Sequence, residues 1–544
     1  MRANHYGSAA VVSSAGHVLC YVYLLHCNIL KARGFGLDTI PFNEVQTSIS
    51  MDLVKSGPNV SANITDMKTR VSELAGHGPP TYPIIGCLIS FYKNRTRLID
   101  WYTELIAESD TNTIVINRLG TRRTVVTANS ENVEYMLKTN FNNFPKGKPF
   151  TEILGDFLGY GIFNVDGELW RIQRKLASQA FSTNSLREFV MSTLEEEVEN
   201  RFLPSLESLA AASAVVDLQD LLRRLSFNMI CKVSLGVDHC VLDPSQLVSP
   251  PNKAFDMASE ICAKRGAAPL LLVWKVKKWL GVGSEKKLRD AVEEVHAYIE
   301  EIIRNRKKKM DESQENCGED LLSRLILAGC DEEVIRDMII NFIMAGRDTT
   351  SAAMTWLFWL LSCHPVIEQE LLKEIQKNDK ILSDYESLEG LKLLKASLCE
   401  SMSLYPPVAW DSKHAMVDDM LPDGTLVQAG DRVTYFPYGM GRMEALWGKD
   451  CIEFRPSRWF IEPSHQGGSL KKVSPYKFPV FQAGPRICLG RDMAFIQMKY
   501  VVASILRQFE IKPIGSEKPI FVPLLTAHMA GGLKVLIKKR DHSI

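Results

Sequence analysis

The sequence lacks net charge, paired cysteines and internal repeats. Its 64 Lys and Arg residues balance 64 Asp and Glu residues, so no overall positive field favours nucleic acid, and we expect no nucleic-acid partner. The 12 cysteines form no CxxC pair, which argues against a zinc ribbon and against a dense disulfide scaffold. With 46% hydrophobic residues in a chain of 544, a large buried core remains possible.

A strongly apolar leading segment is also missing. Residues 8–30 carry no formal charge and are long enough to cross a bilayer, but serines and two histidines weaken the pattern. Lys31 and Arg33 follow, and the positive-inside rule would then place the rest of the chain in the cytosol. We predict a membrane anchor within residues 1–33 and a linker over 34–77. A cleaved leader is the alternative for the first segment.

The remainder of the chain, residues 78–544, has no convincing linker and is expected to be one large domain. Two β-rich runs, "TIVINRL" from Thr113 and "RRTVVTA" from Arg122, predict short strands, and a helix is predicted over Ser130–Lys138. Helical patterns dominate from there to about residue 363. The prediction is therefore a mainly α fold with smaller β-sheets.

One predicted helix is unusually long. It begins at Glu332, with acidic residues in its first turn, and ends before Pro365, so it would span roughly 45 Å. Arg347 and Asp348 near its middle argue against a membrane span. We therefore expect a long central helix that runs through the body of the domain.

The segment Phe481–Gly490, "FQAGPRICLG", surrounds Cys488 with features that favour a thiolate. Its glycines permit tight turns, and Arg486 brings a fixed cation close to the sulfur. The following residues predict a helix whose N-terminal amides would face the loop. Phe481 can pack against a flat apolar group, so the segment meets the requirements of a thiolate-ligated haem.

These ten residues resemble the cysteine-ligand loop of the cytochrome P-450 superfamily, Phe-x-x-Gly-x-Arg-x-Cys-x-Gly, and every specified position is present. The resemblance implies the cytochrome P-450 fold, a single large haem domain. It also implies iron protoporphyrin IX with Cys488 as the axial metal ligand and with Phe481 and Arg486 at the cofactor. A buried structural cysteine in a loop is the alternative that the motif disfavours.

Two further segments add to the resemblance. "AGRDTT", Ala345–Thr350, is similar to the family's oxygen-activation segment, where Thr349 would contact dioxygen and Asp348 would help deliver protons. A glycine and a threonine there make a local helix distortion plausible, whereas the simpler interpretation is a salt-bridged kink of Arg347 and Asp348. In "LWRIQRK", Trp170 and Arg174 lie four apart on one helix face, a pair that the family places on the haem propionates.

One expected element is absent. "ESMSLYPPV" aligns with the family's Glu-x-x-Arg helix, but Ser403 stands at the arginine position, so Glu400 is left to pair with Arg458 alone. Losing a member of a buried charge network costs on the order of 3 to 5 kcal/mol. The hypothesis is that folding or haem incorporation is impaired. A degenerate, haem-deficient and non-catalytic copy is the alternative to an active enzyme.

The resemblance extends to one branch of the superfamily. The segments Asn143–Ser178, Tyr438–Asp450 and Leu525–Val535 are similar to plant fatty-acid ω-hydroxylases. That similarity implies ω-hydroxylation of fatty acids, or oxidation of jasmonoyl-isoleucine or a related derivative. It also implies location at the endoplasmic reticulum membrane, on the cytosolic side.

Electrons must then come from another protein, because the chain has no Gly-rich dinucleotide fingerprint after a strand. The implied partner is NADPH-cytochrome P-450 reductase. Lys146 and Lys148 are candidates to receive a substrate carboxylate, and a solvated loop is the simpler interpretation. A haem-thiolate isomerase or dehydratase, which would need no reductase, is the rival enzyme class.

Overall fold

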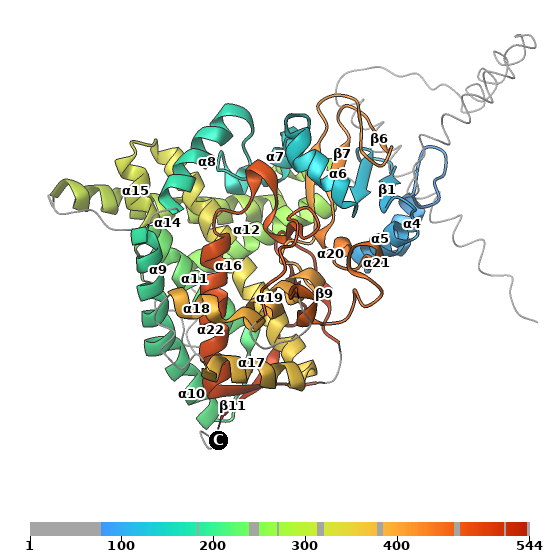
Figure 1. The fold of residues 1–544 in the computed structure, drawn as a ribbon. Coiled ribbons are helices and arrows are strands. Elements are labelled where there is room, and N and C mark those ends of the chain that lie inside the picture. Colours follow the sequence, from blue (N-terminus) through green and yellow to red (C-terminus); the bar gives the residue numbers. More distant parts are fainter. Residues whose placement is uncertain are drawn as a thin grey trace, which may run out of the picture. The chain divides into compact units, whose positions relative to one another are not determined.

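The computed structural model describes residues 78–181, 184–238, 250–268, 271–312, 320–377, 385–461, 468–515 and 518–540. The predicted anchor and linker lie outside the described residues. Helices make up most of the described chain, and short strands form small sheets (Figure 1). This confirms the prediction of a mainly α fold with smaller β-sheets.

The largest sheet in the described ranges contains the predicted hairpin. β1 (Thr113–Ile116) and β2 (Thr124–Thr127) pair antiparallel, and β2 pairs parallel with β7 (Arg432–Tyr435), which is followed by β4 (Asp411–His414). The smaller sheets pair β3 (Val215–Asp217) and β8 (Phe509–Pro513) with β11 (Lys534–Lys539), β9 (Phe521–Val522) with β10 (His528–Met529), and β5 (Asp419–Met420) with β6 (Leu426–Val427).

The long predicted helix is α16, Glu332–Cys363, which runs for 32 residues without a break. Its first turn carries the acidic residues that favour a helix N-terminus, and Pro365 follows its end. α11 (Leu218–Leu235) packs along α16, and both α19 (Lys392–Leu404) and α22 (Arg491–Gln508) contact it. The expectation of a long central helix is therefore confirmed.

The other helices of the described ranges are shorter, α14 with its 29 residues being second in length to α16, and several are labelled in Figure 1. The predicted helix at residue 130 begins as α6 and continues as a π-helical turn over Tyr135–Thr139. The full set is α4 (Leu88–Lys93), α5 (Leu98–Ala107), α6 (Ser130–Glu134), α7 (Gly147–Leu158), α8 (Gly167–Phe181), α9 (Asn184–Glu197), α10 (Leu203–Ala211), α12 (Pro250–Ala267), α13 (Leu271–Leu280), α14 (Ser284–Glu312), α15 (Leu321–Leu327), α17 (Pro365–Lys377), α18 (Tyr385–Gly390), α20 (Pro437–Met440) and α21 (Glu444–Trp447).

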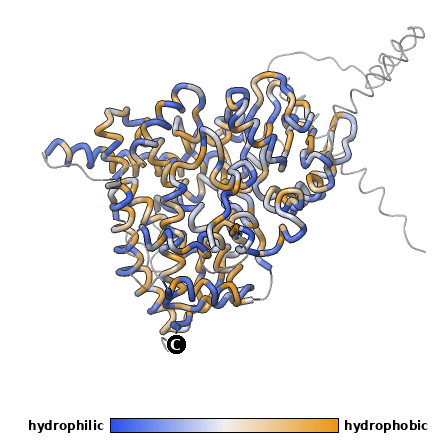
Figure 2. The backbone as a smooth tube through the Cα atoms, viewed as in Figure 1, coloured by the Kyte–Doolittle hydropathy of each residue, from blue (hydrophilic) through white to orange (hydrophobic). Residues whose placement is uncertain are grey.

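Apolar side chains form one large core around α16 and a second one against the β1-β2-β7-β4 sheet. Hydrophobic and hydrophilic residues alternate along the helices, as amphipathic packing requires (Figure 2). Trp356 of α16 stacks on Tyr405 with ring centres 4.0 Å apart.

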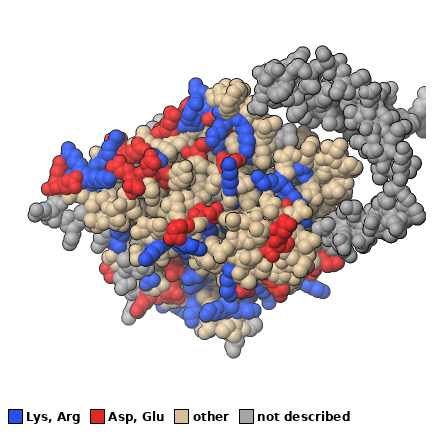
Figure 3. All heavy atoms as spheres, turned by 90° about the horizontal axis from the view of Figure 1, so that it is seen from above, with Lys and Arg blue, Asp and Glu red and all other residues tan. Residues whose placement is uncertain are grey.

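Acidic and basic side chains are interspersed on the surface (Figure 3), in keeping with the balanced charge. None of the described helices combines the length and hydropathy that a membrane span needs.

Candidate active site

Cys488 lies in the turn that leads into α22. Its backbone N–H donates to the carbonyl oxygen of Phe481 at 2.8 Å, which closes the loop between the two residues. Gly484 has a φ of +64°, and a Cβ atom there would lie 2.0 Å from the carbonyl oxygen of Leu137, so glycine is required at this close approach. The Phe481 ring lies 5.2 Å from that of Phe495.

Cys488 is an exposed residue, so its side chain can be reached by a ligand. Desolvation by the surrounding protein raises the pKa of the thiol. The backbone N–H of Gly490 and the guanidiniums of Arg174 and Arg491 lower this pKa and so favour the thiolate.

Two predicted cofactor residues of α8, Trp170 and Arg174, meet the loop residue Arg486 or its neighbours. The Arg174 side chain donates to the carbonyl oxygen of Ile487, next to Cys488. The guanidinium carbon of Arg486 lies 4.5 Å from the centre of the Trp170 ring. An indole N–H and two guanidiniums are donors suited to carboxylates, so these residues could hold the propionates of a haem. Together with an accessible thiol and a nearby phenylalanine, this donor set fits haem.

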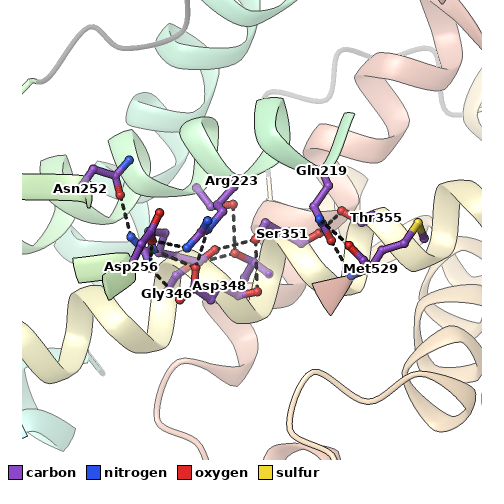
Figure 4. A network of polar contacts seen from close by, with 12 residues as sticks. Gln219, Arg223, Asn252, Asp256, Gly346, Asp348, Ser351, Thr355 and Met529 are labelled. Carbon is purple, nitrogen blue, oxygen red and sulfur yellow. Dashed lines mark hydrogen bonds and ion pairs between the residues drawn. The ribbon is translucent and has the colours of Figure 1, made fainter. Parts of the chain in front are cut away.

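The residues of the predicted oxygen-activation segment lie on α16, and Asp348 belongs to a charge network (Figure 4). Arg347 donates to both carboxylate oxygens of Asp348, at 2.8 and 2.9 Å, and Arg223 of α11 donates from Nε at 3.0 Å. Burial would raise the pKa of Asp348, but the two guanidiniums lower it to about 2. The Thr349 hydroxyl donates to the carbonyl oxygen of Ala345 at 2.6 Å.

Gly346 lies where α16 packs against α11. A Cβ atom at this position would lie 2.6 Å from Cδ1 of Ile230, so the glycine lets α11 and α16 approach each other. The helix is continuous through this segment, and the expected local distortion is not seen. The salt bridge between Arg347 and Asp348 is present, but without a kink.

Glu400 lies on α19 and accepts from three donors although position 403 is not an arginine. Its Oε1 accepts from Nε of Arg458 at 2.7 Å and from the backbone N–H of Arg455 at 2.9 Å. Its Oε2 accepts from Nε1 of Trp459 at 2.8 Å. The predicted Glu400–Arg458 pair is therefore formed, and Ser403 is buried beside it on the same helix.

Sequence reasoning missed the acidic partners near the loop. Arg486 donates to Oδ1 of Asp166 at 2.7 Å, a pairing that no local motif signals because the residues lie far apart in the sequence. Lys146 was a candidate for binding a substrate carboxylate, but it is only 5% exposed and its Nζ lies 2.5 Å from Oδ1 of Asp411. Lys148 is exposed.

Comparisons with known proteins agree with this geometry. The family model described as Cytochrome P450 matches residues 77–534. The chain is 56% identical to Cytochrome P450 94B1 of Arabidopsis thaliana, over 87% of this chain and 94% of the relative. It is 43% identical to Cytochrome P450 94A1 of Vicia sativa, over 85% and 91%. The fold resembles the crystal structure of the cytochrome P450DA heme domain, with a TM-score of 0.71 and 18% identity over 85% of this chain and 97% of that one.

Proposed function

This chain belongs to the cytochrome P450 family, and from that premise we propose that it hydroxylates fatty acids at the ω position. Enzymes of this family are monooxygenases that hold haem through a cysteine thiolate and use electrons delivered from NADPH by a reductase. The observation that carries the monooxygenase part of the proposal is the exposed Cys488, whose loop, including Arg486, meets Trp170 and Arg174.

Haem bound through a thiolate supplies oxygen activation, in which one atom of dioxygen enters a C–H bond and the other leaves as water, with two electrons and two protons consumed. The chain's own residues bind, orient and move protons. Thr349 donates its hydroxyl proton to Ala345, so the lone pairs of its oxygen stay available to accept a hydrogen bond. Asp348 is ionised and would carry a proton only when Arg223 or Arg347 releases it.

The choice of fatty acids rests on the similarity of three segments to the plant ω-hydroxylase branch. Phe150 and Phe163 are partly buried and suit the lining of a channel for an alkyl chain. Phe157, by contrast, is fully buried against Phe255, with ring centres 5.6 Å apart, and so belongs to the core. Jasmonoyl-isoleucine, or a related fatty-acid derivative, is the alternative substrate.

The test is turnover by the full chain with NADPH-cytochrome P450 reductase. Saturated fatty acids of graded length and jasmonoyl-isoleucine are supplied in parallel, with a Cys488→Ser variant as the control. NADPH-dependent ω-hydroxy acids support the proposal, and turnover of jasmonoyl-isoleucine alone would replace the substrate. Product formed without NADPH would favour the isomerase or dehydratase class.

A haem-deficient, non-catalytic copy is the second candidate function, and Ser403 is the observation in its favour. The three donors to Glu400 count against this candidate, because they hold the carboxylate without an arginine at position 403. Haem occupancy of the wild type and of Ser403→Arg, read from the carbon-monoxide difference spectrum, separates the two. Much higher occupancy in Ser403→Arg would support impaired haem incorporation, and equal occupancy would refute it.

We also propose that the protein is held at the endoplasmic reticulum membrane through residues 8–30, with the catalytic part on the cytosolic side. The proposal rests on the uncharged segment and on the basic residues after it. The full chain is expected to stay with microsomal membranes after an alkaline wash. Release into the supernatant would contradict the anchor.

A further inference from the structure

The cysteine loop is tied to the rest of the protein through two of its side chains, Gln482 and Arg486. The amide Nε2 of Gln482 donates to Oδ2 of Asp411 on β4 at 3.1 Å. Arg486 donates from Nη2 to Oδ1 of Asp166 at 2.7 Å. Both acceptors are carboxylates, and both lie outside the loop.

One short turn, residues 145–147, holds both carboxylates. The Nζ of Lys146 lies 2.5 Å from Oδ1 of Asp411. The backbone N–H groups of Lys146 and Gly147 donate to the two oxygens of Asp166, at 3.0 and 2.9 Å. Nδ1 of His414 in turn lies 2.5 Å from the carbonyl oxygen of Lys146. A movement of this turn would therefore displace both of the carboxylates that Gln482 and Arg486 bind.

Asp411 is a buried carboxylate. Its Oδ2 also accepts from Nζ of Lys413 at 2.9 Å and from the Tyr435 hydroxyl at 3.0 Å. Burial alone would raise the pKa of Asp411, but Lys146 and Lys413 hold it well below its usual range. A hydrogen bond to an ionised carboxylate is stronger than one between neutral groups, so the bond from Gln482 holds the cysteine loop firmly to Asp411.

The backbone of Gln482 has a conformation that residues with a side chain normally avoid. Gln482 has a φ of +59° and a ψ of −173°, a region that residues with a side chain rarely adopt. Such a conformation persists only where the surrounding structure imposes it. The bond to Asp411 and the backbone N–H bond to the Pro479 carbonyl, at 3.0 Å, supply that constraint.

We propose that Lys146, Asp411 and Asp166 are positioning residues for the cysteine ligand. Acting through Gln482 and Arg486, they hold the loop so that Cys488 meets the haem iron as a thiolate. They act on the ligand through the loop and carry no chemical step themselves.

The first test compares Gln482→Met with Gln497→Met. The first variant keeps the side-chain length and removes the tether. The second removes the same amide from a buried position on α22 whose Nε2 has no hydrogen-bond partner among the described residues. The readouts are haem content and the rate at which the reduced, carbon-monoxide-bound protein loses the Soret band of thiolate-ligated haem.

Gln482→Met is expected to lose that band about tenfold faster than the wild type. Tenfold corresponds to about 1.4 kcal/mol, close to the lower end for a hydrogen bond to a charged group. Gln497→Met should behave like the wild type. Gln482→Asn, which keeps a donor and tolerates a positive φ, should recover part of the loss. Equal rates for Gln482→Met and the wild type would overturn the proposal.

The second test uses Lys146→Met, with Lys148→Met, an exposed lysine two residues further on in α7, as its matched control. Lys146→Met should accelerate loss of the thiolate band, because Asp411 loses one of its two lysine partners and is held less firmly. Lys148→Met should leave the rate unchanged. Weaker fatty-acid binding by Lys146→Met with an unchanged rate of band loss would make Lys146 a substrate residue and would overturn the proposal.

Discussion

The Nε of Arg458 lies 2.7 Å from Oε1 of Glu400, and the two residues form a buried pair where relatives are expected to have two arginines. The other donors to the carboxylate come from Trp459 and from the backbone of Arg455. Burial raises the pKa of Glu400, while Arg458 is the largest of the influences that lower it. Arg458 therefore supplies the one guanidinium that contacts this carboxylate among the described residues.

Replacing Arg458 should therefore be costly. Arg458→Met is expected to lower the free energy of unfolding by about 3 to 5 kcal/mol, the cost of leaving a buried charge without its partner. Arg455→Met is the control, since its side chain is 56% exposed and pairs with Asp450 at the surface, an interaction worth about 0 to 1 kcal/mol. Thermal unfolding and haem content measure both, and similar losses in the two variants would contradict the interpretation.

Thr349 and Thr350 are neighbouring hydroxyl residues on α16, and comparing their variants tests the predicted contact of Thr349 with dioxygen. Thr350 donates to the Gly346 carbonyl and bonds Ser226 of α11, so it serves the packing of the two helices. Thr349→Val should reduce product formed per NADPH about tenfold to a hundredfold, because the hydroxyl expected to bond dioxygen is lost. Thr350→Val should keep this ratio. The measurement is product against NADPH consumed, and equal ratios would remove Thr349 from the reaction.

Gly346 should resist substitution because of Ile230. Gly346→Ala places a methyl group against the Ile230 side chain, and overpacking costs about 1 to 3 kcal/mol, against a gain of up to about 1 kcal/mol in helix propensity. We expect a net loss of about 1 to 2 kcal/mol. In an Ile230→Ala background the same change should cost less, and additive effects in this double-mutant cycle would contradict the contact.

His414 should make stability depend on pH. Burial lowers its pKa to about 4, because Nε2 is buried without a hydrogen-bond partner among the described residues and would carry the added proton. The unfolded chain takes up this proton near pH 6.5 and the folded chain near pH 4, so stability is lost as the pH falls through this window. Between pH 7 and pH 5 the loss is about 2 kcal/mol.

A His414→Gln variant lacks this titration. Its apparent melting temperature should therefore fall less than that of the wild type between pH 7 and pH 5. Parallel curves would show that His414 does not set the dependence.

The parts that sequence reasoning predicted are those encoded by neighbouring residues. The cysteine loop is specified within ten residues, and α16 is specified by an apolar pattern with acidic residues at its start and a proline after its end. The Glu400–Arg458 pair was also anticipated, because the two motifs that carry it are each local.

Tertiary structure decided what these residues touch. Lys146 seemed suited to a substrate carboxylate, yet folding buries it against Asp411, because a buried carboxylate needs cationic partners. Gly346 was expected to favour a local distortion of the helix, and it faces Ile230 because α11 packs tightly along α16. Sequence alone therefore determined which chemical groups are present and on which helices and loops they lie. Packing of distant segments determined their partners, since burial requires each polar group to find a hydrogen bond wherever the fold supplies one.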